Sequence, residues 1–183
     1  ACARLVVFMT KKIFQQKIRA WYRVYGRDEL PWRMKKDPWH ILISEIMLQQ
    51  TQVERVIPFY KKFIARFPAP AVLVRASQRD VLELWRGLGY NRRALYLKRT
   101  ADIVVREHAG RVPHDISALE ALPGVGHYTA RAVAAFAWDA REVFIETNIR
   151  RVYIHFFFAR REVVRDKEIV GMIQKTLPKR NIC

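Results

Sequence analysis

The sequence predicts an all-helical protein. Apolar residues recur at every third or fourth position in successive segments, while lysines and arginines fill the positions between them; the first such segment contains Phe14, Ile18, Trp21 and Tyr25. Glycines and prolines separate the segments, as turn residues do between helices. No alternation of apolar and polar residues runs for more than a few positions, and no internal repeat or flexible linker is present. These observations favour packed helices over sheets.

The other helices are predicted in chain order from the same spacing. Residues 41–48 are apolar nearly all round, which is typical of a buried helix. Five more segments carry apolar residues at helical spacing: Val56, Tyr60, Phe63 and Phe67; Val81, Leu82, Leu84 and Trp85, capped by Ser77 and Asp80; Leu95, Ala101, Val104 and Val105; Ile149, Val152, Tyr153 and Phe156; and a segment that begins near Asp166 as N-cap. In the third of these we expect the basic residues Arg92, Arg93, Lys98 and Arg99 to be available at the surface.

The charge of the chain indicates its partner. Its 183 residues include 34 lysines and arginines against 17 aspartates and glutamates, a formal net charge of +17. Half of the residues are hydrophobic, so this charge lies on a folded surface, where it attracts polyanions. Nucleic acid is the leading partner and an acidic membrane surface is the alternative. No apolar run approaches the roughly 20 residues of a spanning helix.

The cysteine content excludes a disulfide framework and a cysteine metal cluster. Only Cys2 and Cys183 occur, one near each end of the sequence. Such sparse use of cysteine fits a reducing compartment, and we expect a cytoplasmic, nucleoid-associated protein.

A glycine-rich turn between two short helical segments is the feature around which the rest of the chain is organised. Residues 117–138 read as helix, turn and helix, with Gly124, Val125 and Gly126 in the turn. Glycine permits a tight turn and close approach to another molecule, and the N–H groups at the start of the next helix suit a phosphate. His127 and Arg131 add donors. This is the pattern of a helix-hairpin-helix that grips a nucleic-acid backbone; the alternative is an ordinary helix–loop–helix corner.

Glu45 is the one carboxylate within the apolar segment 41–48. An isolated buried acid is costly unless it is paired or protonated, so burial there would raise its pKa. Alternatively, Glu45 occupies an exposed stripe of the helix. The polar residues 49–52 follow, and their amides could enter a base stack or simply cap the helix.

A second tight turn and the start of a later helix carry further candidate residues. Residues 87–90 form a tight turn that ends in Tyr90, and Arg92 follows closely; an aromatic ring beside arginines suits stacking on bases, although Tyr90 could equally be a core residue. Glu146 and Asn148 stand at the start of a helix, where a carboxylate is favoured by the helix dipole. Glu146 could alternatively be no more than the helix cap.

Taken together, five runs of sequence resemble the helix-hairpin-helix DNA glycosylase superfamily and, within it, the MutY-type adenine glycosylases. These runs are residues 30–32 (LPW), 44–53 (SEIMLQQTQV), 87–90 (GLGY), 122–130 (LPGVGHYTA) and 146–152 (ETNIRRV). The run that begins at Ser44 is specific for the MutY branch, whereas the hairpin is specific only for the superfamily. The resemblance covers roughly residues 21–158.

The resemblance implies a two-lobed fold with a DNA-binding cleft. Residues 30–140 would form a six-helix barrel lobe that contains the helix-hairpin-helix at 117–138. Residues 1–29 plus 141–183 would form the second helical lobe, which we expect to be truncated at its C-terminal end. An adenine mispaired with 8-oxoguanine or guanine would be flipped into the cleft.

The resemblance also implies roles for the catalytic residues. Glu45 matches the acid that protonates the departing adenine. Glu146 stands where the family carries Asp, with Thr147 in place of the following Gly, and would stabilise the cationic sugar. Asn148 matches a residue that supports the site. Tyr128 stands where bifunctional relatives such as endonuclease III carry a nucleophilic Lys, so we expect a monofunctional glycosylase in which Tyr128 lies in the pocket; the alternative is a core tyrosine.

Gln49 and Tyr90 match the family's base-stack intercalators. The other residues expected to contact double-stranded DNA lie beside these two, in the hairpin or in the second lobe: Gln50, Arg92, Gly124, Val125, Gly126, His127, Thr129 and Arg150. We expect a monomer without a membrane partner. The family's iron–sulfur cluster needs four closely spaced cysteines, which this sequence lacks, so we expect no cofactor. We also expect the protein to lack the C-terminal domain that recognises 8-oxoguanine in relatives, and therefore to have a weaker preference for that base.

Two other functions remain open from sequence. A mismatch glycosylase that removes thymine or uracil opposite guanine is similar in size and often carries Tyr at the position of Tyr128. A catalytically weak DNA-binding protein would use only the hairpin and the basic surface.

Overall fold

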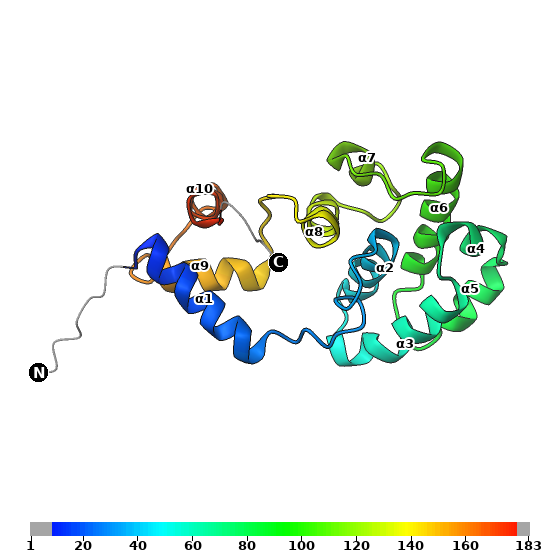
Figure 1. Cartoon of the computed structure of the whole chain (residues 1–183), viewed down its shortest axis with the longest axis horizontal. Helices are drawn as coiled ribbons and strands as arrows, with labels where there is room; N and C mark the ends of the chain where they lie inside the picture. The colour runs from blue at the N-terminus through cyan, green and yellow to red at the C-terminus, as the bar shows by residue number, and fades with distance from the viewer. Residues whose placement is uncertain (1–8, 179–183) are drawn as a thin grey trace, which may run out of the picture. The chain divides into compact units, whose positions relative to one another are not determined.

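The computed structural model describes residues 9–178, and the prediction of an all-helical fold is confirmed for this range, which contains ten helices and no strand (Figure 1). The helices are α1 (Lys11–Tyr25), α2 (Pro38–Leu48), α3 (Val53–Arg66), α4 (Pro70–Arg75), α5 (Gln78–Trp85), α6 (Arg92–Glu107), α7 (Ile116–Glu120), α8 (His127–Trp138), α9 (Thr147–Phe157) and α10 (Asp166–Thr176).

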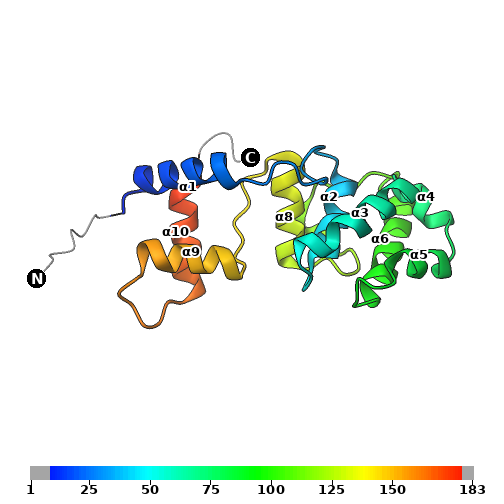
Figure 2. The same ribbon diagram turned by 90° about the horizontal axis from the view of Figure 1, so that it is seen from below.

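Two compact units make up the described chain. The first, which we call the central unit, spans Asp28–Glu142 and contains α2 to α8. The second, the terminal unit, combines residues 9–27 with residues 143–178 and contains α1, α9 and α10 (Figure 2). Each unit has its own hydrophobic core.

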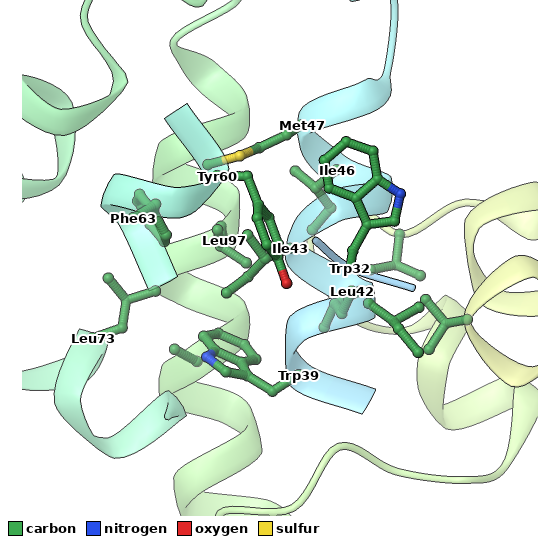
Figure 3. Packing of buried hydrophobic residues seen from close by; sticks show 14 of the residues in the cluster. Trp32, Trp39, Leu42, Ile43, Ile46, Met47, Tyr60, Phe63, Leu73 and Leu97 are labelled. Atoms are coloured by element: carbon green, nitrogen blue, oxygen red, sulfur yellow. The ribbon is translucent and has the colours of Figure 1, made fainter. Parts of the chain in front are cut away.

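Helix α2 forms the middle of the central unit and packs against α3, α6 and α8. Asp37 caps its first turn by accepting hydrogen bonds from the amides of Trp39 and His40, and Pro38 occupies the first turn, where no amide donor is needed. Every residue from Trp39 to Met47 except His40 is buried. Figure 3 shows the α2 side chains in contact with aromatic and aliphatic residues from the surrounding helices. Burial of each large side chain contributes roughly 1.5–3 kcal/mol, which makes α2 a rigid support for the residues on it.

Helix α6 differs from the sequence prediction in the face that it buries. Ala94, Leu97, Ala101 and Val104 point inward at three- and four-residue spacing, whereas Leu95 and Val105 are half-buried. The expectation that Arg93 is available at the surface is wrong, because residue 93 lies one turn before Leu97 on the same buried face. The predicted capping box of Ser77 and Asp80 at the start of α5 is confirmed.

The terminal unit packs α1 and α9 against α10 around Phe14, Tyr153 and Ile169. Helix α10 begins at Asp166 with Arg165 as its N-cap, so the expectation that Asp166 is the cap is off by one residue. The hydroxyl groups of Tyr153 and Thr176 are 2.6 Å apart inside this core. In neither unit does a described helix have the length and apolar character that a membrane crossing requires.

Candidate functional site

Glu45 is a buried carboxyl group in the middle of α2, with 8% of its surface exposed. Within residues 9–178 it receives no hydrogen bond, so little compensates the loss of water around its charged form. Desolvation therefore raises the pKa of Glu45 to about 7, and the positive charge of Arg33 opposes this effect in part. The alternative that Glu45 occupies an exposed stripe is wrong. Near neutral pH this side chain can both donate and accept a proton.

The end of α2 is tied directly to the hairpin. Gln49 is the C-cap residue of α2, and its side-chain amide donates to the carbonyl oxygen of Gly124 at 3.1 Å and to Oγ1 of Thr129 at 3.3 Å. Gln50, the next residue, is exposed and has φ +55°. The structure thus places Gln49, Gly124 and Thr129 of the expected DNA-contacting set side by side.

The hairpin consists of α7 and α8 joined by a short turn, as expected from the sequence. Gly124 has φ +79°, and a Cβ at this position would lie 3.1 Å from the Cβ of Tyr96, so both the backbone conformation and the close packing favour glycine. Gly126 has φ −91° and serves as the N-cap of α8, while Val125 is buried and anchors the turn. The first amides of α8, next to the exposed side chain of His127, form a donor group suited to a phosphate.

The side chains expected to add donors at this helix start already have acidic partners. Nδ1 of His127 lies 3.0 Å from Oε1 of Glu120, and Arg131 lies 2.5 Å from the same oxygen. Arg131 also lies 3.5 Å from a carboxylate oxygen of Glu142. The backbone amides of α8 are therefore the main donors that the turn presents. Tyr128, in the first turn of α8, is 37% exposed, so the alternative that it is a core tyrosine is wrong.

The second turn presents an aromatic ring. Gly87 and Gly89 have φ values of +97° and +86°, and Tyr90 follows with φ +50°. Tyr90 is 61% exposed, which excludes the core alternative. The exposed Arg92 stacks over the ring of Tyr96, with 5.2 Å between the guanidinium and the ring centroid.

Arg93 is a residue that the sequence prediction missed. Its guanidinium is buried between the end of α2 and the 87–90 turn, where it donates to backbone oxygens of both segments. A signal was present in the sequence, because residue 93 lies four positions before Leu97 and so falls on the inward face of α6.

Glu146 belongs to the terminal unit and is the N-cap of α9. One carboxylate oxygen accepts from the amide of Ile149 at 2.8 Å, and the other accepts from the side-chain amide of Asn148 at 3.2 Å. Arg150 donates to the carbonyl oxygen of Val164 at 2.7 Å and pairs with Asp166. The structure thus brings Glu146 and Asn148 together as a capped helix start. Glu45 and Glu146 lie in different units, and their joint action stays a prediction.

The residues present do not fit an iron–sulfur cluster. Four thiolates hold such a cluster, whereas the sequence contains Cys2 and Cys183, which lie outside the described residues. Over residues 9–178, no three His, Cys, Asp or Glu side chains gather in a way that could hold a metal ion.

Comparisons with known proteins find similar sequences. The family model described as "HhH-GPD superfamily base excision DNA repair protein" matches residues 43–177. Among curated relatives, the chain is 40% identical to an adenine DNA glycosylase of Buchnera aphidicola over 92% of its length, and 47% identical to one of Mycobacterium tuberculosis over 78%. The chain spans about half the length of these two relatives, 47% in each case. It is 34% identical to a thymine/uracil-DNA glycosylase of Pyrobaculum aerophilum, with 91% of this chain and 74% of the relative covered.

Solved structures give the same fold. A thermostable thymine-DNA glycosylase superposes with a TM-score of 0.82 at 28% identity, covering 92% of this chain and 78% of that one. A non-covalent endonuclease III–DNA complex superposes with a TM-score of 0.76 at 22% identity, covering 93% of this chain and 79% of that one.

Proposed function

The chain belongs to the HhH-GPD superfamily of base excision DNA repair proteins, and we propose that it hydrolyses the N-glycosidic bond of adenine mispaired with 8-oxoguanine or guanine in duplex DNA. The observation that carries this proposal is the buried Glu45, whose pKa of about 7 keeps a proton available for a leaving base. The run around Glu45 carries the MutY-type pattern, and the relatives from Buchnera aphidicola and Mycobacterium tuberculosis are named adenine DNA glycosylases.

The reaction needs one proton donor and one water molecule. Glu45 donates its proton to the adenine as the C1′–N bond breaks, and the bonding electron pair leaves with the base. Water then adds to C1′ of the cationic sugar and loses a proton to the Glu45 carboxylate, which restores the acid. A carboxylate near the sugar stabilises the cation, and Glu146 is the residue that we assign to this role.

Tyr128 makes this a hydrolysis without strand cleavage. A phenol cannot form a Schiff base with the sugar, whereas a lysine amine at this position can. The chain therefore acts as a monofunctional glycosylase.

Duplex DNA is the proposed partner of the +17 chain. The amides at the start of α8 bind a backbone phosphate, while Tyr90 and Gln49 fill the space that the flipped base leaves. We propose that the protein acts as a monomer associated with chromosomal DNA.

Removal of thymine or uracil opposite guanine is the second candidate function. Two observations favour it: the 34% identity to the Pyrobaculum aerophilum thymine/uracil-DNA glycosylase, and the likeness to the thermostable thymine-DNA glycosylase structure.

A single-turnover assay separates these functions. Duplexes that contain A:8-oxoguanine, A:G, T:G or U:G are quenched with and without alkali, and Glu45→Gln is run beside the parent chain. The proposal expects cleavage of the adenine duplexes only after alkali and its loss in Glu45→Gln. Release from T:G or U:G alone would establish the second candidate, and binding without release from any duplex would overturn both.

A further inference from the structure

Arg93 is a buried side chain of the central unit with an extensive set of hydrogen bonds. It lies in the first turn of α6, is 7% exposed, and donates hydrogen bonds of 2.5–3.1 Å to five acceptors. These acceptors are the carbonyl oxygens of Ile46, Met47, Gln49 and Gly89 and the hydroxyl oxygen of Thr51.

Three of these bonds satisfy the C-terminal end of α2. The last carbonyls of a helix have no partner within the helix, and they carry the negative end of its dipole. A buried guanidinium supplies both donors and positive charge at this point, so Arg93 fixes the end of α2. Glu45 lies one residue before Ile46, the first carbonyl that Arg93 binds.

The other side of the same guanidinium holds the 87–90 turn. One nitrogen donates to the carbonyl oxygen of Gly89 at 3.0 Å, and the indole of Trp85 donates to that oxygen at 3.1 Å. The guanidinium carbon also lies 5.6 Å from the ring centroid of Trp85 and 5.3 Å from that of Tyr90. Arg93 therefore has the buried Trp85 and the exposed Tyr90 as its two ring partners.

We propose that Arg93 is a positioning residue that fixes Tyr90 and Gln49, the proposed base-stack residues, relative to the helix that carries Glu45. The role rests on the proposed function: the buried Arg93 acts by holding the groups that are proposed to contact the DNA. Its hydrogen bonds reach residues 46–51 on one side and Gly89 on the other, and its guanidinium lies over the ring of Tyr90. One side chain thus sets the spacing between the proton donor and the intercalating ring.

Lysine cannot replace this arrangement. An ammonium group carries the same charge but lacks the planar fork that serves two segments at once, and it lacks the flat face that stacks on Tyr90. Arg93 also carries the one buried side-chain polar atom without a partner in residues 9–178, Nε, so its burial is costly.

The test compares Arg93→Lys with Arg99→Lys, an equally conservative change at an exposed arginine of the same helix. We call the hydrogen bonds of Arg93 to residues 46–51 and to Gly89 the Arg93 clamp. Hydrogen exchange of the protein without DNA measures whether this clamp holds the two segments. We expect amides in 48–52 and 88–91 to exchange at least about tenfold faster in Arg93→Lys, with α3 and α10 unchanged. Arg99→Lys should leave all of these segments unchanged.

The single-turnover rate of base release then measures the effect of the substitution on function. We expect Arg93→Lys to release adenine about ten- to a hundredfold more slowly, because a displacement of about 1 Å is this costly, while DNA affinity changes less than threefold. A fluorescent 2-aminopurine next to the mismatch in the duplex reports base unstacking, and its fluorescence increase should be smaller with Arg93→Lys than with the parent chain. Added guanidinium ion at millimolar concentration should restore part of the rate in Arg93→Ala and none in Glu45→Gln.

The outcomes separate this proposal from the proposed function. Unchanged exchange in 48–52 and 88–91 overturns the clamp, and faster exchange with an unchanged release rate overturns the positioning role. If the parent chain releases no base, the proposed function fails, while the exchange experiment still decides whether Arg93 clamps the two segments. If Arg93→Lys is unfolded, the guanidinium experiment on Arg93→Ala under folding conditions decides instead, and absence of rescue overturns the proposal.

Discussion

The side-chain amide of Gln49 donates a hydrogen bond to the carbonyl oxygen of Gly124 across 3.1 Å. This bond joins the end of the helix that carries Glu45 to the turn of the hairpin. A second bond from the same amide to Oγ1 of Thr129 reaches the first turn of α8. The proposed entry of Gln49 into a base stack would require its amide to exchange both bonds for contacts with DNA.

The hairpin turn depends on glycine at position 124. Alanine there would adopt φ near +79° and place its Cβ 3.1 Å from Tyr96, and we expect Gly124→Ala to lower the free energy of unfolding by about 1–3 kcal/mol. Thermal unfolding and DNA binding measure the effect. Gly171→Ala is the matched control, because residue 171 lies inside α10 with open space around it. That change should stabilise the protein by about 0.5–1 kcal/mol; an equal loss in both variants would contradict the prediction.

The rate of base release should depend on the protonation of Glu45. Its pKa of about 7 means that the acid form declines as the pH rises through 7. We expect the single-turnover rate to fall by about tenfold for each pH unit above this value. A rate that stays level to pH 9 would show that Glu45 is not the proton donor.

The free energy of unfolding should also depend on the protonation of Glu45. Burial raises the pKa of Glu45 from 4.5 to about 7, so the folded state binds this proton more tightly than the unfolded state. The benefit is complete below pH 4.5 and is lost as the pH rises to 7. Relative to the parent, Glu45→Gln should therefore gain about 3 kcal/mol of stability over this interval. Urea unfolding at pH 4.5 and pH 8 measures the gain, and parallel curves for the two proteins would refute it.

Glu146 can be tested for a role beyond its cap. Serine is a good N-cap and carries no charge, so Glu146→Ser should keep the stability within about 0.5 kcal/mol. If the carboxylate stabilises the cationic sugar, this variant should release adenine about a hundredfold more slowly. Glu146→Ala is the companion variant, since it loses the cap as well and should be less stable by about 1 kcal/mol. Full activity in Glu146→Ser would reduce the residue to a helix cap.

Tyr128 should determine whether the sugar is attacked by water or by the protein. Tyr128→Lys places an amine at an exposed position in the first turn of α8. We expect this variant to form a covalent DNA complex that borohydride traps, whereas the parent forms none. Trapping is measured by a gel shift under denaturing conditions. Tyr128→Phe controls for loss of the hydroxyl and should trap nothing.

Several features could be predicted from the sequence because they depend on local physics. Helical spacing of apolar residues marked the helices other than α4, which the sequence prediction missed, and the Ser77–Asp80 pair marked the start of α5. The apolar run 41–48 indicated a buried helix with one acid in it, and Glu45 is indeed buried there. Glycine at position 124 indicated a turn with positive φ. Each of these signals lies within a few residues of the feature that it predicts.

Arg93 shows what the sequence alone left undecided. Residues beside it in the chain suggested a surface arginine, but four of its five acceptors lie in residues 46–51, which only folding brings to it. The same holds for Gln49, whose partners at Gly124 and Thr129 are more than seventy residues away in the chain. The sequence determined which segments other than α4 are helical, which helix is buried and that one acid lies inside it, since spacing and hydrophobicity decide these. Only the tertiary structure decided which polar groups meet, because long-range hydrogen bonds depend on how the helices pack rather than on the order of the residues.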